Sequence, residues 1–315
     1  MPPNVELAVH RSGTAVIIGR SNVGKSTLLN SALRQKLAIV SPTPQTTRDR
    51  ILGVVRHRDA QVALLDTPGL HRPRSKLGRR MNAAARDSII GADVMVFMTA
   101  LSAKMTGPLE PHPGDVNLLT DLGKDTPSIL VINKVDLCKD KTRLLPLLEA
   151  FAKLRPFAAV VPICARQEDG VLRVLDEVAK LLPERGAAYD EDFLTDRPLR
   201  FFASEYIREQ VFLATKQEVP HSVAVSIDRF DDTGPVVHIE ATVHCARSGQ
   251  RAILIGVRGE KMKSIGIAAR KRIEPLLERQ VNLKLWVKVT EGWTESPELM
   301  AEIGYDPEGG EAQSS

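Results

Sequence analysis

The chain has 315 residues, 43% of them hydrophobic, a length that suggests two domains, each with its own core. The formal net charge of +4 permits an anionic partner without requiring one. Its three cysteines show no pairing or metal-ligand spacing, residues 1–11 lack the apolar segment of a secretory signal, and no apolar run approaches the roughly 18 residues that span a bilayer. Disulfide-rich secreted proteins and membrane-spanning proteins are therefore disfavoured, and we expect a protein of the reducing cytosol.

The first patterned stretch is the apolar run Ala15–Ile18, followed by the sequence G-x-x-x-x-G-K-S and by Thr27–Leu33, which favours a helix. A strand, a glycine-bounded loop and a helix in this order are typical of a P-loop, whose backbone N–H groups bind phosphate oxygens. In such a loop Lys25 reaches the β- and γ-phosphates and the Ser26 hydroxyl ligates Mg²⁺. The predicted phosphate-binding residues are Gly19, Arg20, Ser21, Asn22, Val23, Gly24, Lys25, Ser26 and Thr27.

Beyond this loop, short apolar strands alternate with helical patterns as far as Leu182, which predicts an α/β domain with a mostly parallel, doubly wound sheet. Ser41–Asp49, His71–Arg80 and Thr106–Asp115 are expected to be irregular because of their prolines, glycines and charges. The expected strands are Ile51–His57, Val62–Leu65, Val94–Met98, Ser128–Ile132 and Ala159–Pro162, and the expected helices include one that carries Met81 and Ile89, then Val116–Leu122, Leu144–Leu154 and Val171–Leu182.

Two further segments supply groups that a nucleotide triphosphate requires. Thr46 and Thr47 lie in the loop after the first helix, where a switch threonine closes over Mg²⁺ and the γ-phosphate. The stretch Asp66-Thr67-Pro68-Gly69 follows a strand, which places the Asp66 carboxylate to hold Mg²⁺ and the Gly69 N–H to meet the γ-phosphate. The spacing alone leaves the choice between Thr46 and Thr47 open.

The base is predicted by Asn133-Lys134-Val135-Asp136, which also follows a strand. The Asp136 carboxylate can accept hydrogen bonds from the N1–H and the exocyclic amine of guanine. Adenine lacks these donors and would leave a buried charge unpaired, so ATP is disfavoured. Cys164 and Ala165 are expected to offer backbone N–H groups to guanine O6. Each motif alone is a common polar turn, but four of them in this order predict GTP.

The group that orients the attacking water is not evident from the sequence. Ras-type GTPases place a glutamine directly after the glycine of Asp-x-x-Gly, whereas this chain has Leu70, which cannot accept a hydrogen bond. We therefore expect slow intrinsic hydrolysis of GTP. Asn22 is a candidate catalytic residue beside Lys25, Thr47, Asp66 and Gly69, because its side-chain oxygen could ligate K⁺ next to the phosphates; the alternative is that it only braces the loop.

The pattern changes after a stretch with clustered acids, and we expect a GTPase domain over 1–183, a linker over 184–198, a second domain over 199–295 and a mobile tail over 296–315. In the second domain, helices are expected over Leu199–Leu213, Arg251–Ile255 and Lys261–Leu277, and strands over Val223–Ile227, Val236–Val243 and Val281–Val289.

Gly256-Val257-Arg258-Gly259, between an apolar helix and a basic helix, matches the G-x-x-G loop of KH domains, which binds the backbone of single-stranded RNA. Eight basic residues and one acid occupy 247–272, so the basic charge is concentrated here. A lone G-x-x-G is usually a turn, and basic charge is often the solvated face of a helix; flanking order and charge together favour RNA. The predicted RNA-binding residues are Gly256, Val257, Arg258, Gly259, Lys261, Lys263 and Arg270.

Taken together, these segments resemble the Era family of ribosome-assembly GTPases over nearly the whole chain. The resemblance rests on 19–29 (GRSNVGKSTLL), 45–48 (QTTR), 66–70 (DTPGL), 133–136 (NKVD), 190–197 (DEDFLTDR), 204–208 (SEYIR), 255–266 (IGVRGEKMKSIG) and 285–289 (LWVKV). It departs from the family at Ser21, where Pro is common, and at Cys164, where Ser is usual.

The resemblance implies a GTP-switched protein that binds the 3′ end of 16S ribosomal RNA and assists 30S subunit maturation.

 It also implies a bound guanine nucleotide with Mg²⁺, a monomer, and peripheral contact with the inner membrane, for which the sequence offers no signal of its own. By the same resemblance Thr47 is favoured over Thr46 as the switch threonine, and Asn133 and Asp136 read guanine; Lys134, between them, is included among the expected nucleotide-binding residues.

Two other functions stay open at this point. The first is a constitutive RNA-binding protein whose GTP site only regulates or stabilises it, which the intact Lys25, Ser26 and Asp66 disfavour. The second is a GTPase that uses its basic helix on anionic lipid, which the shortage of large apolar residues in that helix disfavours.

Overall fold

The computed structural model describes residues 11–71, 73, 75–102, 108–123, 125–215 and 219–305, which form two compact units. The first unit comprises Met1–Ala38, Thr47–Arg72 and Met81–Asp196, and the second comprises Ile39–Thr46, Pro73–Arg80 and Arg197–Ser315. Two segments of the predicted GTPase domain, 39–46 and 73–80, therefore belong to the second unit. Within the described residues, no helix is both long enough and apolar enough to cross a membrane.

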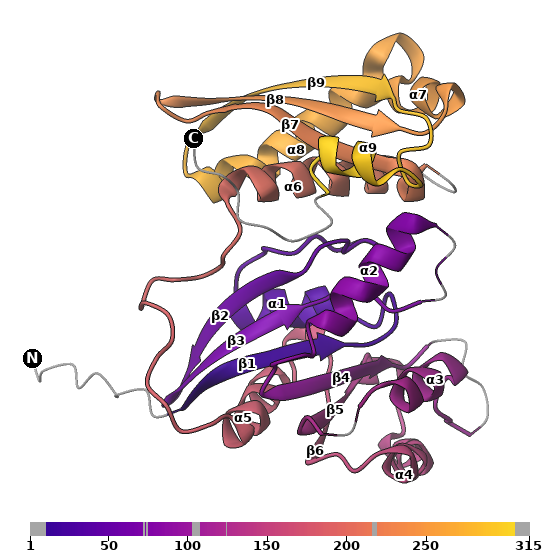
Figure 1. Ribbon diagram of the computed structural model, residues 1–315, viewed down its shortest axis with the longest axis vertical. Helices are drawn as coiled ribbons and strands as arrows, with labels where there is room; N and C mark the ends of the chain where they lie inside the picture. Colours follow the sequence, from indigo (N-terminus) through magenta and orange to yellow (C-terminus); the bar gives the residue numbers. More distant parts are fainter. Residues whose placement is uncertain are drawn as a thin grey trace, which may run out of the picture. The chain divides into compact units, whose positions relative to one another are not determined.

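The first unit contains a six-stranded sheet with the order β2-β3-β1-β4-β5-β6 (Figure 1). Only β2 runs antiparallel to its neighbour, and the other pairs are parallel, which confirms the mostly parallel α/β sheet. The central strands are apolar on both faces because helices cover both. The strands are β1 (Arg11–Ile18), β2 (Ile51–His57), β3 (Ala60–Asp66), β4 (Val94–Ala100), β5 (Ser128–Asn133) and β6 (Ala159–Pro162).

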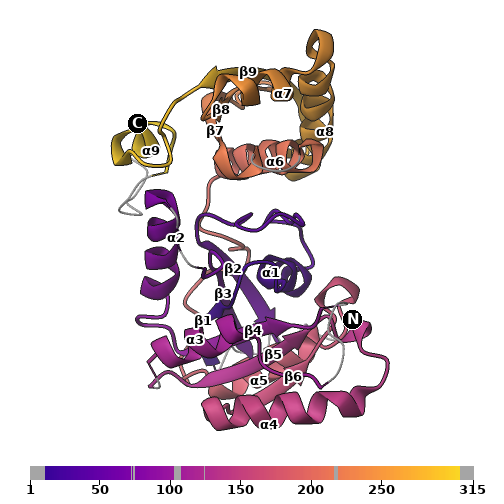
Figure 2. The ribbon, with the colours of Figure 1, turned by 90° about the vertical axis from the view of Figure 1, so that its right-hand side faces the viewer.

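Helices lie on both faces of this sheet (Figure 2). On one face α1 and α5 pack against each other and against the strands. On the other, Ala85 of α2, Leu119 of α3 and Phe151 of α4 share a hydrophobic core with sheet residues such as Phe97. The helices are α1 (Lys25–Leu33), α2 (Lys76–Asp87), α3 (Pro113–Asp121), α4 (Leu144–Leu154) and α5 (Val171–Leu181).

Two helices begin earlier than the sequence predicts. Helix α2 starts at Lys76, inside the stretch 71–80 that was expected to be irregular, and α3 starts at Pro113 rather than Val116. Proline fits the first turn of a helix because its missing N–H has no partner there, which explains the start of α3. Residues 72, 74, 106 and 107 of the expected loops lie outside the described residues.

The second unit contains a three-stranded sheet with the order β7-β8-β9, in which β7 and β8 are antiparallel and β8 and β9 are parallel. Helices α6 and α8 pack on each other, and their buried side chains join those of the sheet in one core. The elements are α6 (Leu199–Ala214), β7 (Val223–Asp231), β8 (Val236–Cys245), α7 (Ser248–Ile255), α8 (Glu260–Leu277) and β9 (Gln280–Val289).

The chain after β9 is ordered further than expected. A short helix, α9 (Pro297–Glu302), occupies the start of the predicted mobile tail. Trp293 is completely buried, its indole N–H donates to Ser222 O over 3.0 Å, and its ring stacks on Tyr305 at 5.8 Å between centroids. The expectation of a mobile segment from Ser296 is therefore wrong as far as Tyr305, and residues 306–315 lie outside the described part of the chain.

Candidate functional site

The phosphate-binding segment Gly19–Ser26 runs from the end of β1 into the first turn of α1 and closes around the side chain of Lys25. The buried Lys25 ammonium donates hydrogen bonds to the backbone oxygens of Gly19 over 3.2 Å and Arg20 over 3.1 Å. Burial lowers the pKa of Lys25 to about 8. Gly24 has a left-handed φ of 107°, and a Cβ there would lie 2.2 Å from the amide nitrogen of Asn133. The loop geometry therefore requires this glycine and holds a cation at its centre.

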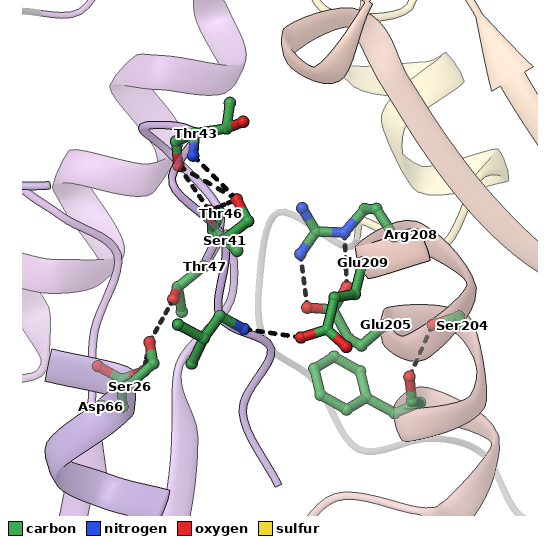
Figure 3. Close-up of polar contacts among 12 residues, drawn as sticks. Ser26, Ser41, Thr43, Thr46, Thr47, Asp66, Ser204, Glu205, Arg208 and Glu209 are labelled. Atoms are coloured by element: carbon green, nitrogen blue, oxygen red, sulfur yellow. Dashed lines mark hydrogen bonds and ion pairs between the residues drawn. The ribbon is translucent and has the colours of Figure 1, made fainter. Parts of the chain in front are cut away.

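Ser26, Thr47 and Asp66 bring three side-chain oxygens together at the start of α1 (Figure 3). The Ser26 hydroxyl lies 2.8 Å from Thr47 Oγ1 and donates to Asp66 Oδ2 over 2.6 Å. Thr46 is engaged elsewhere, because its hydroxyl donates to Thr43 O over 2.6 Å and lies 2.7 Å from Ser41 Oγ. Of the two candidate threonines, the structure thus brings Thr47 to Ser26.

The Asp66 carboxylate fits a hard cation. It is completely buried, and burial raises its pKa to about 6. Its Oδ1 has no hydrogen-bond partner among the described residues. Buried polar atoms are rarely left without partners, and hydroxyl and carboxylate oxygens are the ligands that Mg²⁺ prefers. An oxygen-binding cation beside Ser26 and Thr47 would satisfy this orphaned atom and stabilise the ionised carboxylate.

The segment after Asp66 lies directly against the phosphate loop. The Thr67 hydroxyl donates to Ile17 O over 2.8 Å, and the Leu70 N–H donates to Gly19 O over 3.2 Å. A Cβ on Gly69 would approach Ser21 to within 2.6 Å, so only glycine fits this approach. Leu70 is 3% exposed and belongs to the hydrophobic core, so its apolar side chain packs inward.

Asn133 ties the predicted base-binding segment to the phosphate loop. Its amide donates to Val23 O over 2.8 Å and its carbonyl oxygen accepts from Ala165 N over 3.0 Å. Lys134 takes a left-handed φ of 60° and donates from Nζ to Asn22 O over 2.8 Å. Asn133 therefore braces the two loops, while Asp136 is exposed.

The backbone N–H groups of Cys164 and Ala165, which the sequence predicts to meet guanine O6, both have protein acceptors in this structure. Ala165 N–H donates to Asn133, and Cys164 N–H donates to Asp169 O over 3.0 Å. Either group would have to leave a protein acceptor before it met guanine O6. Burial, together with a hydrogen bond to Asp136, raises the pKa of the Cys164 thiol, so the thiol stays neutral beside this carboxylate.

Asp115 is a residue of this site that the sequence did not reveal. The Arg20 guanidinium donates to its two carboxylate oxygens over 2.7 and 3.1 Å, and the Thr99 hydroxyl donates to Oδ2 over 2.7 Å. Asp115 is completely buried, so this pairing fixes Arg20 and with it one side of the phosphate loop. The residues lie 95 positions apart, and no motif links them.

In the second unit a groove of about 560 Å³ lies between α7, α8 and β9 and reaches Gly259, the last residue of the Gly256–Gly259 loop. Arg258 and Gly259 have left-handed φ values of 50° and 79°, which turn the loop sharply. Of the predicted RNA-binding residues, Gly259, Lys263 and Arg270 line the groove, whereas Gly256, Val257, Arg258 and Lys261 are not among its lining residues.

Trp286 also lines this groove and is 47% exposed. An exposed indole beside basic side chains offers a flat face on which a base can stack. The sequence carries a usable signal for it, because Trp286 has the same parity along β9 as the exposed residues Asn282, Lys284 and Lys288. Arg251 adds a further positive charge to the lining.

Comparisons with known proteins agree with this geometry. The family model described as a 50S ribosome-binding GTPase matches residues 14–134, and the KH domain model matches residues 218–294. The chain is 41% identical to GTPase Era of Ruminiclostridium cellulolyticum, covering 94% of this chain and 98% of that protein. It is 42% identical to GTPase Era of Xanthomonas campestris, covering 96% of this chain and 99% of that protein.

Two solved structures superimpose on nearly the whole chain. Era in complex with MgGDPNP and nucleotides 1506–1542 of 16S ribosomal RNA has a TM-score of 0.88, 36% identity, and coverage of 94% of this chain and 99% of that one. Aquifex aeolicus Era Y63A bound to GDP·AlF₄⁻ has a TM-score of 0.87 at the same identity and coverage.

Proposed function

The chain belongs to the GTPase Era family, and from this we propose that it hydrolyses GTP with Mg²⁺, binds the 3′ region of 16S ribosomal RNA, and assists 30S subunit assembly in a nucleotide-dependent way. The observation that carries the nucleotide part is the cluster of Ser26, Thr47 and Asp66, in which a buried carboxylate oxygen lacks a partner. These three oxygens would hold Mg²⁺, which would neutralise phosphate charge.

The remaining roles follow from where the residues lie. Lys25 would exchange its two carbonyl partners for phosphate oxygens, and the N–H of Gly69 would meet the γ-phosphate. The exposed Asp136 would accept hydrogen bonds from guanine. Asn133 would act by holding the base and phosphate loops together rather than by contact with the base.

The buried Leu70 supports slow intrinsic hydrolysis. Asn22 has an exposed side chain and a left-handed φ of 64°, so the proposal that it ligates K⁺ beside the phosphates stands as a prediction. Single-turnover rates measured in K⁺ and in Na⁺ test it. A rate that is higher in K⁺ and that loses this preference in Asn22→Ala is expected, and equal rates in the two salts would contradict it.

The groove of the second unit supports RNA binding. Arg251, Lys263 and Arg270 line it with positive charge, and Trp286 offers a stacking surface. Phosphate contacts from such cations supply affinity that falls with salt, while stacking tolerates any base. The direction of coupling to the nucleotide, a monomeric state and peripheral contact with the inner membrane remain predictions.

The decisive experiment measures the affinity of the full chain for an RNA of the 16S 3′ region with a non-hydrolysable GTP analogue, with GDP and without nucleotide, at fixed salt. Tighter binding with the GTP analogue supports the proposed switch. Asp66→Asn should abolish the difference by weakening Mg²⁺ binding, and Asp121→Asn, at an exposed position, is the control. Equal affinity in all three states would leave a constitutive RNA-binding protein.

A further inference from the structure

The hydroxyl of Ser21 is a buried polar group without a hydrogen-bond partner among the described residues. Asp66 Oδ1 and His71 Nε2 are in the same situation. These residues belong to the phosphate loop and to the segment that lies against it. The Asp66 oxygen is accounted for by a cation, whereas nothing in the proposed function uses the Ser21 oxygen. Such unsatisfied groups in a folded protein need an explanation, and a bound ligand is one.

The position of Ser21 relative to Gly69 is well defined. A Cβ on Gly69 would lie 2.6 Å from Ser21 Oγ, so the hydroxyl packs directly over this glycine. The N–H of Leu70, the residue after Gly69, donates a hydrogen bond to Gly19 O over 3.2 Å, and His71 Nδ1 lies 2.9 Å from Gly69 O. The hydroxyl therefore sits where the phosphate loop meets the segment whose N–H groups face the γ-phosphate.

Hydrolysis of GTP requires an attacking water beside the γ-phosphate, and GTPases of the Ras type orient it with a side chain next to the Asp-x-x-Gly glycine. A water oxygen forms a bond to the γ-phosphorus, the bond to the β–γ bridging oxygen breaks, and its electron pair leaves on GDP. The protons of the water end on the phosphate product. Leu70, in the place where Ras-type enzymes have a glutamine, is buried in the core and cannot hold this water.

We propose that the Ser21 hydroxyl orients the attacking water in this chain. This inference rests on the proposed GTP hydrolysis. A serine hydroxyl has one donor and two acceptor sites, so it can accept a hydrogen bond from the water while it donates to a γ-phosphoryl oxygen. Alanine and proline lack this group, and threonine retains it.

The test is single-turnover hydrolysis of saturating GTP with Mg²⁺ by the full chain. Ser21→Ala and Ser21→Pro are each expected to lower the rate about tenfold, which corresponds to about 1.4 kcal/mol of transition-state stabilisation. GDP affinity should stay within about twofold, because the hydroxyl acts on the water and the γ-phosphoryl group. Ser21→Thr should retain most of the rate.

The control is Ser12→Ala, which removes a buried serine hydroxyl near the opposite end of β1 and should leave the rate unchanged. A wild-type rate in Ser21→Ala would overturn the inference. So would a wild-type rate in Ser21→Pro beside a slow Ser21→Ala, because loop stiffness would then explain the effect. If the wild-type chain itself hydrolyses no GTP, the proposed function fails, and the inference fails with it.

Discussion

The backbone N–H of Val40 donates a hydrogen bond to Glu209 Oε1 over 3.1 Å. Glu209, labelled on α6 in Figure 3, is buried, with 1% of its surface exposed. The preceding residue, Ile39, is buried in the core of the second unit. Seven residues after Val40, Thr47 contacts Ser26 in the nucleotide site. One short segment of chain thus has one end anchored in the core of the second unit and the other end at the proposed Mg²⁺ ligands.

The hydrogen bond between Val40 and Glu209 predicts that Glu209 contributes to the effect of the bound nucleotide on RNA affinity. In Glu209→Ala the segment loses its fixed end, so ordering of Thr47 by GTP should no longer bias the second unit. The affinity ratio for RNA between the GTP-analogue and GDP states is expected to shrink by about fivefold, near 1 kcal/mol of coupling free energy. RNA titrations in both states measure it. Glu291→Ala, at an exposed glutamate of the same unit, should keep the wild-type ratio.

The buried carboxylate of Asp115 predicts a large cost when it is removed. Asp115→Ala leaves Arg20 and the Thr99 hydroxyl without their acceptor, and the free energy of unfolding should fall by about 3 kcal/mol. GDP affinity should fall as well, because Arg20 belongs to the phosphate loop. Urea denaturation and a fluorescent GDP analogue measure the two effects.

Helix α3 offers the matched control in Asp121, whose ion pair with Arg86 is about half exposed on both sides. Asp121→Ala should change the free energy of unfolding by less than about 1 kcal/mol. Equal losses in the free energy of unfolding for Asp115→Ala and Asp121→Ala would contradict the prediction, because the buried pair with Arg20 would then stabilise the protein no more than an exposed ion pair does.

Trp286 predicts a contribution to RNA affinity that does not depend on nucleotide. Trp286→Ala should weaken RNA binding about tenfold through loss of base stacking, and Trp286→Phe should weaken it less. GTP hydrolysis without RNA should be unchanged.

In contrast, Lys263→Ala should reduce the salt dependence of RNA affinity by about one phosphate contact. Fluorescence anisotropy over a salt series distinguishes the two, and an unaltered affinity in Trp286→Ala would remove the indole from the interface.

His244 on β8 predicts that the second unit loses stability in acid. Burial, and then the charge of Lys288, lower its pKa, while Asp228 and Glu302 oppose the shift. The neutral ring is held between Ser226 Oγ at 3.0 Å and Thr290 Oγ1 at 2.9 Å. The unfolded state binds the proton of His244 more tightly than the folded state does. The contribution of the neutral His244 ring to the free energy of unfolding is therefore complete above its unfolded pKa of about 6.5 and is lost as the pH falls through its pKa in the folded protein.

Both tryptophans, Trp286 and Trp293, lie in the second unit, so their fluorescence reports its unfolding. Urea midpoints of the full chain should fall between about pH 7.5 and about pH 5.5, and His244→Gln should flatten this dependence. His238→Gln, at an exposed histidine of the same strand, is the control and should keep the wild-type slope. The same slope in all three proteins would assign the acid sensitivity to other groups.

The sequence by itself determined the features that depend on contiguous residues. The phosphate loop Gly19–Ser26, Asp66–Gly69 and the alternation of strands and helices are local patterns, because backbone conformation and side-chain periodicity act over a few residues. The α/β class, the KH-type second domain and the position of most elements followed from them. The adjacent pair Thr46 and Thr47 could not be resolved in this way, since both lie in one irregular loop.

Only the tertiary structure decided which residues meet across long separations. The Asp115 carboxylate accepts hydrogen bonds from Arg20, and the Glu209 carboxylate accepts one from the N–H of Val40. The amide oxygen of Asn133 accepts one from the N–H of Ala165. The start of α2 belongs to the same class: the N–H groups of Lys76 and Leu77 donate to Glu295 Oε2 over 3.3 Å and to Thr294 O over 3.1 Å. Buried donors and acceptors must find partners, and packing rather than spacing along the chain determines which partner is within reach.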